Sequence, residues 1–247
     1  MSIKNFKLTI QYDGTNYSGW QIQKDQETVQ GTLKQSVENI IHNNNVNIIG
    51  SGRTDSGVHS LGQVMNMKIE TNMNETEMLK SMNANLPYDI KVVKSEIVDE
   101  SFNARFSAKK REYIYQVINK ATPFNYKYYW QYPYTYDLDI LNKCADIVLN
   151  QSDFSGFCKH SPDINNYNCD IYKSLWIQDN DGLKYNISAN RFLHHMVRML
   201  VGTMLEVSRG KLLVDDFIEL FNMNDNKRNI LTAPSKGLYL SKVFYAD

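Results

Sequence analysis

The chain has 247 residues, of which 42% are hydrophobic and 22% charged, a composition that indicates a globular protein with one large domain or two small ones. No run of about 18 apolar residues predicts a transmembrane helix, and the N-terminus lacks the apolar core of a signal peptide, so we expect a cytoplasmic protein that contacts no membrane. The formal net charge of zero at pH 7 gives no sign of nucleic-acid binding but does not exclude it, because charges can segregate onto separate faces.

The first half of the chain predicts alternating strands and helices. Residues 6–12 alternate between apolar and polar side chains, which is typical of a half-buried strand. Apolar residues at helical spacing follow Thr28 and Asn74, which are suitable N-caps. The expected elements are strands at 6–12, 46–50, 63–70 and 89–98, with helices at 28–45 and 74–87. The resulting order, strand, helix, strand, strand, helix and strand, is that of ferredoxin-like folds.

The second half repeats this order loosely. We expect strands at 111–119, 170–178, 183–189 and 237–245, with helices at 137–150, 192–207 and 214–223. The aromatic-rich segment 123–136 is expected to be a loop or excursion. The sequence therefore predicts an α+β fold of two ferredoxin-like (βαββαβ) halves, residues 1–105 and 106–247, with mainly antiparallel sheets and a central cleft, which is a natural ligand site.

One glycine-rich stretch, GSGRTDSGVHSLGQV at 50–64, carries candidate chemistry. Asp55 lies between Gly52 and Gly57, where the backbone can turn sharply, so its carboxylate can point into a cleft as a nucleophile or base. In a cleft the carboxylate stays ionised only beside a cation, and Arg53 shares its face if the segment is extended. Alternatively, Asp55 caps a turn in a surface loop, and the spacing alone leaves both interpretations open.

Six segments of the chain carry motifs in a characteristic order. The stretch above contains G-R-T-D-x-G-V-H. The other five are YDGTNYSGWQIQ with TVQGTLKQSVE, FNARFSAKKREYIYQV, DFSGF, FLHHMVRMLVGTMLEVSRG and TAPSKGLYLSKVFY. In their order along the chain they resemble the motifs of the TruA family of tRNA pseudouridine synthases, and together they extend over nearly the whole chain.

The resemblance implies an isomerase that needs no cofactor and no metal. Such an enzyme breaks the N-glycosidic bond of a uridine in RNA, rotates the base and rejoins it through carbon. By resemblance Asp55 is the catalytic aspartate, which attacks the base or the sugar or removes a sugar proton. Tyr113, at the end of the strand expected at 111–119, stacks on the flipped uracil and is the candidate acceptor of the proton on carbon five. Arg198 pairs with Asp55 and keeps it ionised.

Three further residues are assigned to substrate binding by the same resemblance. Arg53 helps to extrude the target nucleotide, and Leu238 forms an apolar wall of the uracil pocket. His59 matches the Val-His pair of the motif, and we expect it to shape the loop by hydrogen bonding rather than to transfer protons.

The expected partner is the anticodon stem-loop of tRNA, with positions 38 to 40 as the target, bound across a homodimer. A paralogue acting on another RNA site would carry the same motifs. Two other classes are weaker. An RRM-like RNA-binding module would carry the pattern K/R-G-F/Y-G/A-F-V, which this sequence lacks. A glycoside hydrolase needs two carboxylates beside the bond that it cleaves, and the motifs offer only one convincing candidate.

The cysteines give no sign of a disulfide framework or a metal site. The chain has three, an odd number that fits the reducing cytosol. Cysteine and histidine are both zinc ligands, but the spacing of Cys158, His160 and Cys169 matches no common zinc motif. We therefore predict no metal.

Overall fold

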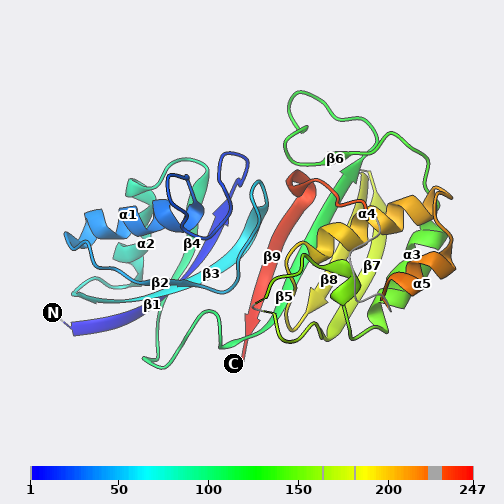
Figure 1. Cartoon of the computed structure of the whole chain (residues 1–247). Helices are drawn as coiled ribbons and strands as arrows, with labels where there is room; N and C mark the ends of the chain where they lie inside the picture. The colour runs from blue at the N-terminus through cyan, green and yellow to red at the C-terminus, as the bar shows by residue number, and fades with distance from the viewer. Residues whose placement is uncertain (1, 163, 181, 222–229, 247) are drawn as a thin grey trace. The chain divides into compact units, whose positions relative to one another are not determined.

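The computed structural model describes residues 2–162, 164–180, 182–221 and 230–246. It divides into unit 1, Met1–Lys109 with Tyr239–Asp247, and unit 2, Lys110–Leu238. Within the described residues the fold is α+β, with five α-helices and largely antiparallel strands, as predicted (Figure 1). None of the helices in these ranges is long and apolar enough to cross a membrane.

Unit 1 has the predicted order of elements. Its own segments are β1 (Ser2–Tyr12), α1 (Val29–Ile41), β2 (Ile48–Gly50), β3 (His59–Thr71), α2 (Glu75–Asn85) and β4 (Ile90–Val98). β1 lies between β3 and β4, antiparallel to both, and β2 pairs antiparallel with β3. β9 (Leu238–Tyr245) returns from the far end of the sequence and pairs parallel with the start of β3.

Local signals in the sequence account for these elements. The alternating residues of β1, Phe6, Leu8 and Ile10, are completely buried on one face of the sheet. The Thr28 hydroxyl accepts a hydrogen bond from the backbone of Gly31 and caps α1. Asn74 and Glu77 form a reciprocal capping box at the start of α2. Both predicted N-caps are therefore confirmed.

Unit 2 contains the remaining elements. They are β5 (Ala108–Ile118), β6 (Trp130–Gln131), α3 (Leu138–Leu149), β7 (Ile171–Asp179), β8 (Gly182–Ala189), α4 (Met196–Ser208), α5 (Val214–Phe221) and two 3-10 turns at Ser155–Phe157 and Ser235–Gly237. β8 lies antiparallel between β5 and β7. The predicted loop at 123–136 contains the short strand β6, because Val117 and Ile118 of β5 pair with it. The last two residues of the helix predicted at 214–223 lie outside the described residues.

The helix predicted at 192–207 begins four residues late, and this prediction of its start was wrong. His195 has a φ of 65°, in the left-handed region, and immediately precedes α4. A right-handed helix cannot include a residue in that conformation, so His194 and His195 precede α4 rather than forming its first turn.

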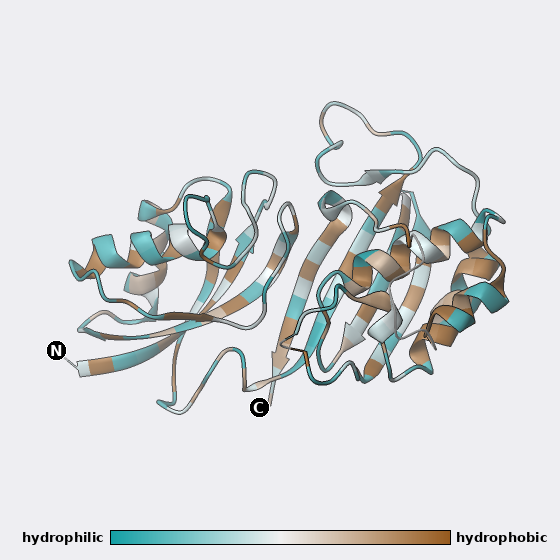
Figure 2. Cartoon of the chain, viewed as in Figure 1, coloured by the Kyte–Doolittle hydropathy of each residue, from teal (hydrophilic) through white to brown (hydrophobic). Residues whose placement is uncertain are grey.

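α4 is buried on almost all sides. Eleven of its 13 residues are buried, whereas α1 buries four of its 13. Figure 2 shows the same contrast, with α4 largely hydrophobic and α1 carrying many hydrophilic residues. A helix that is apolar all round belongs to the core, so α4 offers a rigid support for the side chains at its ends.

We expect Gly202→Ala to lower the free energy of unfolding by about 2 kcal/mol or more. A Cβ atom on Gly202 would overlap the carbonyl oxygen of Leu231 and lie 3.2 Å from the amide nitrogen of Ala233. Urea unfolding measures the loss. Gly52→Ala is the control, since no atom lies within 4 Å of its Cβ, and it should change stability by less than about 1 kcal/mol. Equal losses in the two variants would contradict the close approach at Gly202.

Candidate active site

The loop that carries Asp55 is fixed by hydrogen bonds to the end of β1 and to the segment after it. The backbone N–H of Trp20 donates to Thr54 O over 3.1 Å, and the hydroxyls of Tyr12 and Thr54 lie 2.8 Å apart. The N–H of Gly57 donates to Tyr17 O over 3.3 Å. These bonds come from residues more than 30 positions away, so the loop has a defined shape despite its glycine content.

Two glycines make this shape possible. Gly57 has a φ of 75°, and next to it the Val58 N–H donates to Asp55 O over 3.1 Å. Gly19 has a φ of 89°, and a Cβ atom there would lie 2.6 Å from Thr54 O. In these positions the glycines close a turn and allow two backbones to touch. Within the turn Arg53 is exposed, Thr54 buried and Asp55 partly exposed.

His59 connects the loop to two other segments of unit 1. Its ring is buried and stacks on Tyr239 of β9, with centroids 4.7 Å apart. Its Nδ1 lies 3.1 Å from the backbone N–H of Gly14 and 3.1 Å from a carboxylate oxygen of Asp13. A neutral Nδ1 accepts from Gly14, whereas a protonated Nδ1 donates to Asp13. In either state the imidazole holds the end of the loop, at the start of β3, against the segment after β1 and against β9.

Tyr113 lies inside β5 rather than at the end of a strand, because β5 begins at Ala108. It pairs with Ile187 of β8, and its side chain is 9% exposed. The rings of Tyr113 and Phe192 make an edge-to-face contact, with centroids 5.0 Å apart and an interplanar angle of 85°. The backbone pairing with β8 and the ring contact with Phe192 together restrict the orientation of the Tyr113 side chain.

Arg198 is the third residue of α4 and is tied to the segment that leads into β9. Its Nε donates to Ala233 O over 2.7 Å, and the Ala233 N–H donates back to Arg198 O over 3.0 Å. Five residues further on, Leu238 is buried at the start of β9. Within unit 2, direct hydrogen bonds therefore connect Arg198 to the segment that carries Leu238.

The six predicted site residues are divided between the two units. Arg53, Asp55 and His59 belong to unit 1, and Tyr113, Arg198 and Leu238 belong to unit 2. The pairing of Asp55 with Arg198 stays a prediction.

Known proteins resemble this chain over nearly its whole length. A family model described as tRNA pseudouridine synthase matches residues 8–107 and 151–246. The protein named tRNA pseudouridine synthase A of Lacticaseibacillus casei (strain BL23) is 39% identical over 245 residues, covering 98% of this chain and 99% of the relative. Its namesakes in Thermodesulfovibrio yellowstonii and Geobacillus sp. (strain WCH70) are each 37% identical, with 98% of this chain and 99% and 98% of the relatives covered. The chain belongs to the tRNA pseudouridine synthase family.

Membership in the tRNA pseudouridine synthase family makes the chain an isomerase and confirms the predicted enzyme class. It decides against the glycoside hydrolase and the non-catalytic RNA-binding module. The matched ranges contain Arg53, Asp55 and His59 in the first part and Arg198 and Leu238 in the second, whereas Tyr113 falls between them.

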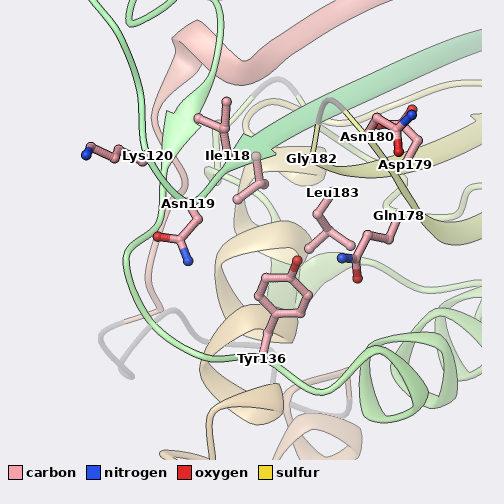
Figure 3. A pocket seen from close by; sticks show the side chains of 10 residues that line it. Ile118, Asn119, Lys120, Tyr136, Gln178, Asp179, Asn180, Gly182 and Leu183 are labelled. Carbon is pink, nitrogen blue, oxygen red and sulfur yellow. The ribbon is translucent and has the colours of Figure 1, made fainter.

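Two cavities of the structure lie apart from the predicted site residues. Figure 3 shows a cavity of about 350 Å³ in unit 2, lined by residues 117–120, Tyr136, 178–180, Gly182 and Leu183. A second cavity, of about 550 Å³, lies in unit 1 beside residues 41–46 and 68–70. Neither contains a predicted site residue, so sequence motifs and not cavity size identify the site of this synthase.

The cysteines have the environment of core residues. All three are buried. Burial raises the pKa of the Cys158 thiol to about 11 and that of Cys169 to about 12.

Some residues that hold the site were missed from sequence. Among them are Tyr12, whose hydroxyl bonds to that of Thr54, and Tyr115, whose hydroxyl donates to Pro234 O over 2.7 Å. Both tyrosines stand within family motifs, and this was the available signal.

Proposed function

We propose that this chain converts uridine to pseudouridine at positions 38 to 40 in the anticodon stem-loop of tRNA. The observation that supports this most strongly is the near-complete coverage, in both directions, between the chain and relatives named tRNA pseudouridine synthase A. The reaction breaks the bond from C1′ to N1 and forms one from C1′ to C5. A proton leaves C5 and a proton is added at N1, so no electrons are gained or lost overall.

We propose the following roles in that reaction. The target base is flipped out of the RNA at a cost of a few kcal/mol, with Arg53 assisting the extrusion. Tyr113 stacks on the uracil, and Leu238 closes the pocket on an apolar side. Asp55 acts on the base or the sugar, and the Arg198 guanidinium holds its carboxylate ionised through paired hydrogen bonds. His59 shapes the loop that presents Asp55.

The proposal extends to the fold and the assembly. The strand order β4-β1-β3, with β2 beside β3, and the order of elements in unit 1 support a ferredoxin-like half. A second such half at 106–247 would supply Tyr113 and Arg198 to a central cleft that faces the catalytic loop of 1–105. A homodimer that binds tRNA across both subunits, and a cytoplasmic location, stay predictions from the family resemblance.

The function is tested with tRNA transcripts that carry tritium at carbon five of every uridine. We expect release of tritium to water, and mapping by carbodiimide modification and reverse transcription should place pseudouridine at positions 38 to 40. A matched transcript with cytidine at these three positions should release none. Equal release from both transcripts would favour a paralogue with another target, and no release from any tRNA would contradict the proposed activity.

A further inference from the structure

A chain of hydrogen bonds in unit 2 leads from the buried face of β5 to Arg198. The Tyr115 hydroxyl donates to Pro234 O over 2.7 Å. The preceding residue, Ala233, accepts from Arg198 Nε over 2.7 Å and donates its N–H to Arg198 O over 3.0 Å. Since the Nε–H bond lies in the plane of the guanidinium, its hydrogen bond restricts the orientation of that plane and with it the direction of the terminal amino groups.

The segment in this chain of bonds is tightly confined. A Cβ atom on Gly237 would lie 2.7 Å from the ring of Tyr115, and one on Gly202 of α4 would overlap Leu231 O. Figure 1 shows this segment, in red before β9, beside β5 and α4. The backbone from Leu231 to Gly237 is thus held between the strand and the helix, with no room to shift toward either.

Tyr115 is suited to hold the segment permanently. Its side chain is completely buried. Burial raises the pKa of its phenol well above the ordinary value, although the charge of Arg198 acts in the opposite direction. The hydroxyl therefore keeps its proton across the neutral range and remains a hydrogen-bond donor to Pro234 O.

We propose that Tyr115 is a positioning residue of the isomerase, which orients the Arg198 guanidinium through the backbone of Ala233 and Pro234. This inference rests on the proposed function, in which Arg198 holds the catalytic carboxylate. Tyr115 touches neither substrate nor Asp55 in this assignment. It acts on the rate only through the direction of the arginine.

The test compares Tyr115→Phe with Tyr132→Phe. Tyr132 is the matched control because it is also buried and its hydroxyl donates to a backbone carbonyl, Leu205 O, two turns after Arg198 on α4. We expect Tyr115→Phe to lower kcat roughly 10- to 100-fold without changing KM for tRNA, because misdirected catalytic groups slow the chemical step. Tyr132→Phe should leave both constants unchanged.

Two further measurements separate positioning from a loss of stability. In an Arg198→Lys background, which lacks the Nε–H, Tyr115→Phe should lower kcat no further. Hydrogen exchange of the Ala233 amide should become about tenfold faster in Tyr115→Phe and not in Tyr132→Phe. The exchange readout needs no activity, so it tests the positioning even if the chain fails to act on tRNA. Unchanged exchange, or the same loss of kcat in both backgrounds, would overturn the proposal.

Discussion

Asp55→Asn is expected to reduce tritium release from tRNA by roughly 10⁴-fold or more, which is the usual scale when a group that acts directly in the chemistry is removed. Asparagine has nearly the same shape as aspartate, and the turn bond from Val58 uses the backbone oxygen of Asp55, so the loop should keep its conformation. What is lost is the negative charge and the nucleophilic or basic oxygen. Single-turnover release with excess enzyme measures the chemical step directly.

The control for this variant is Asp146→Asn, an exposed aspartate on α3. It makes the same change in total charge and should leave the rate unchanged. Binding of tRNA, measured by filter retention, should be similar for both variants and the original chain. If Asp55→Asn kept more than about a tenth of the original rate, the aspartate could not be the central catalytic group.

Much of the fold was predictable because its signals are local. The alternation in β1 and the N-caps Thr28 and Asn74 depend on residues within one or two turns of each other, and the structure confirms them. The start of β3 was placed at residue 63 and lies at His59, because its first residues pair with Tyr239 and Leu240 of β9. A pairing between segments 180 residues apart leaves no periodic pattern in either of them.

The candidate site was likewise predictable only in part. Motif resemblance supplied its reactive residues, but their supports depend on distant contacts that spacing does not encode. Gly19 touches Thr54 only because the fold brings two loops together, and Tyr115 meets Pro234 across 119 residues of sequence. The left-handed conformation of His195, which delays α4, could not be read from spacing either, since positive φ is uncommon for residues other than glycine and leaves no periodic pattern.

Composition was a poor guide to the substrate. A net charge of zero gave no sign of nucleic acid, yet the chain belongs to a tRNA pseudouridine synthase family. A sum over the chain does not report where the charges lie, and a few cations beside phosphates are sufficient for RNA contact.

Arg198→Ala is expected to lower kcat by about 10²- to 10³-fold while changing tRNA affinity much less, the scale observed when one stabilising donor is removed from an active site. In the proposed mechanism the guanidinium serves the carboxylate of Asp55 rather than the phosphates of the RNA. Arg198→Lys keeps the positive charge but lacks the planar fork and the Nε–H that now bonds to Ala233 O. It should therefore recover only part of the lost rate.

Arg209→Ala provides the contrast, because Arg209 follows the last residue of the same helix, where it stacks on Tyr134 at 4.0 Å and pairs with Glu206. Removing this arginine should leave kcat unchanged, and any effect should appear in tRNA affinity. Measuring kcat and the dissociation constant for all three variants separates the two roles. Equal losses of turnover and affinity in Arg198→Ala would mean that this arginine binds RNA rather than the carboxylate of Asp55.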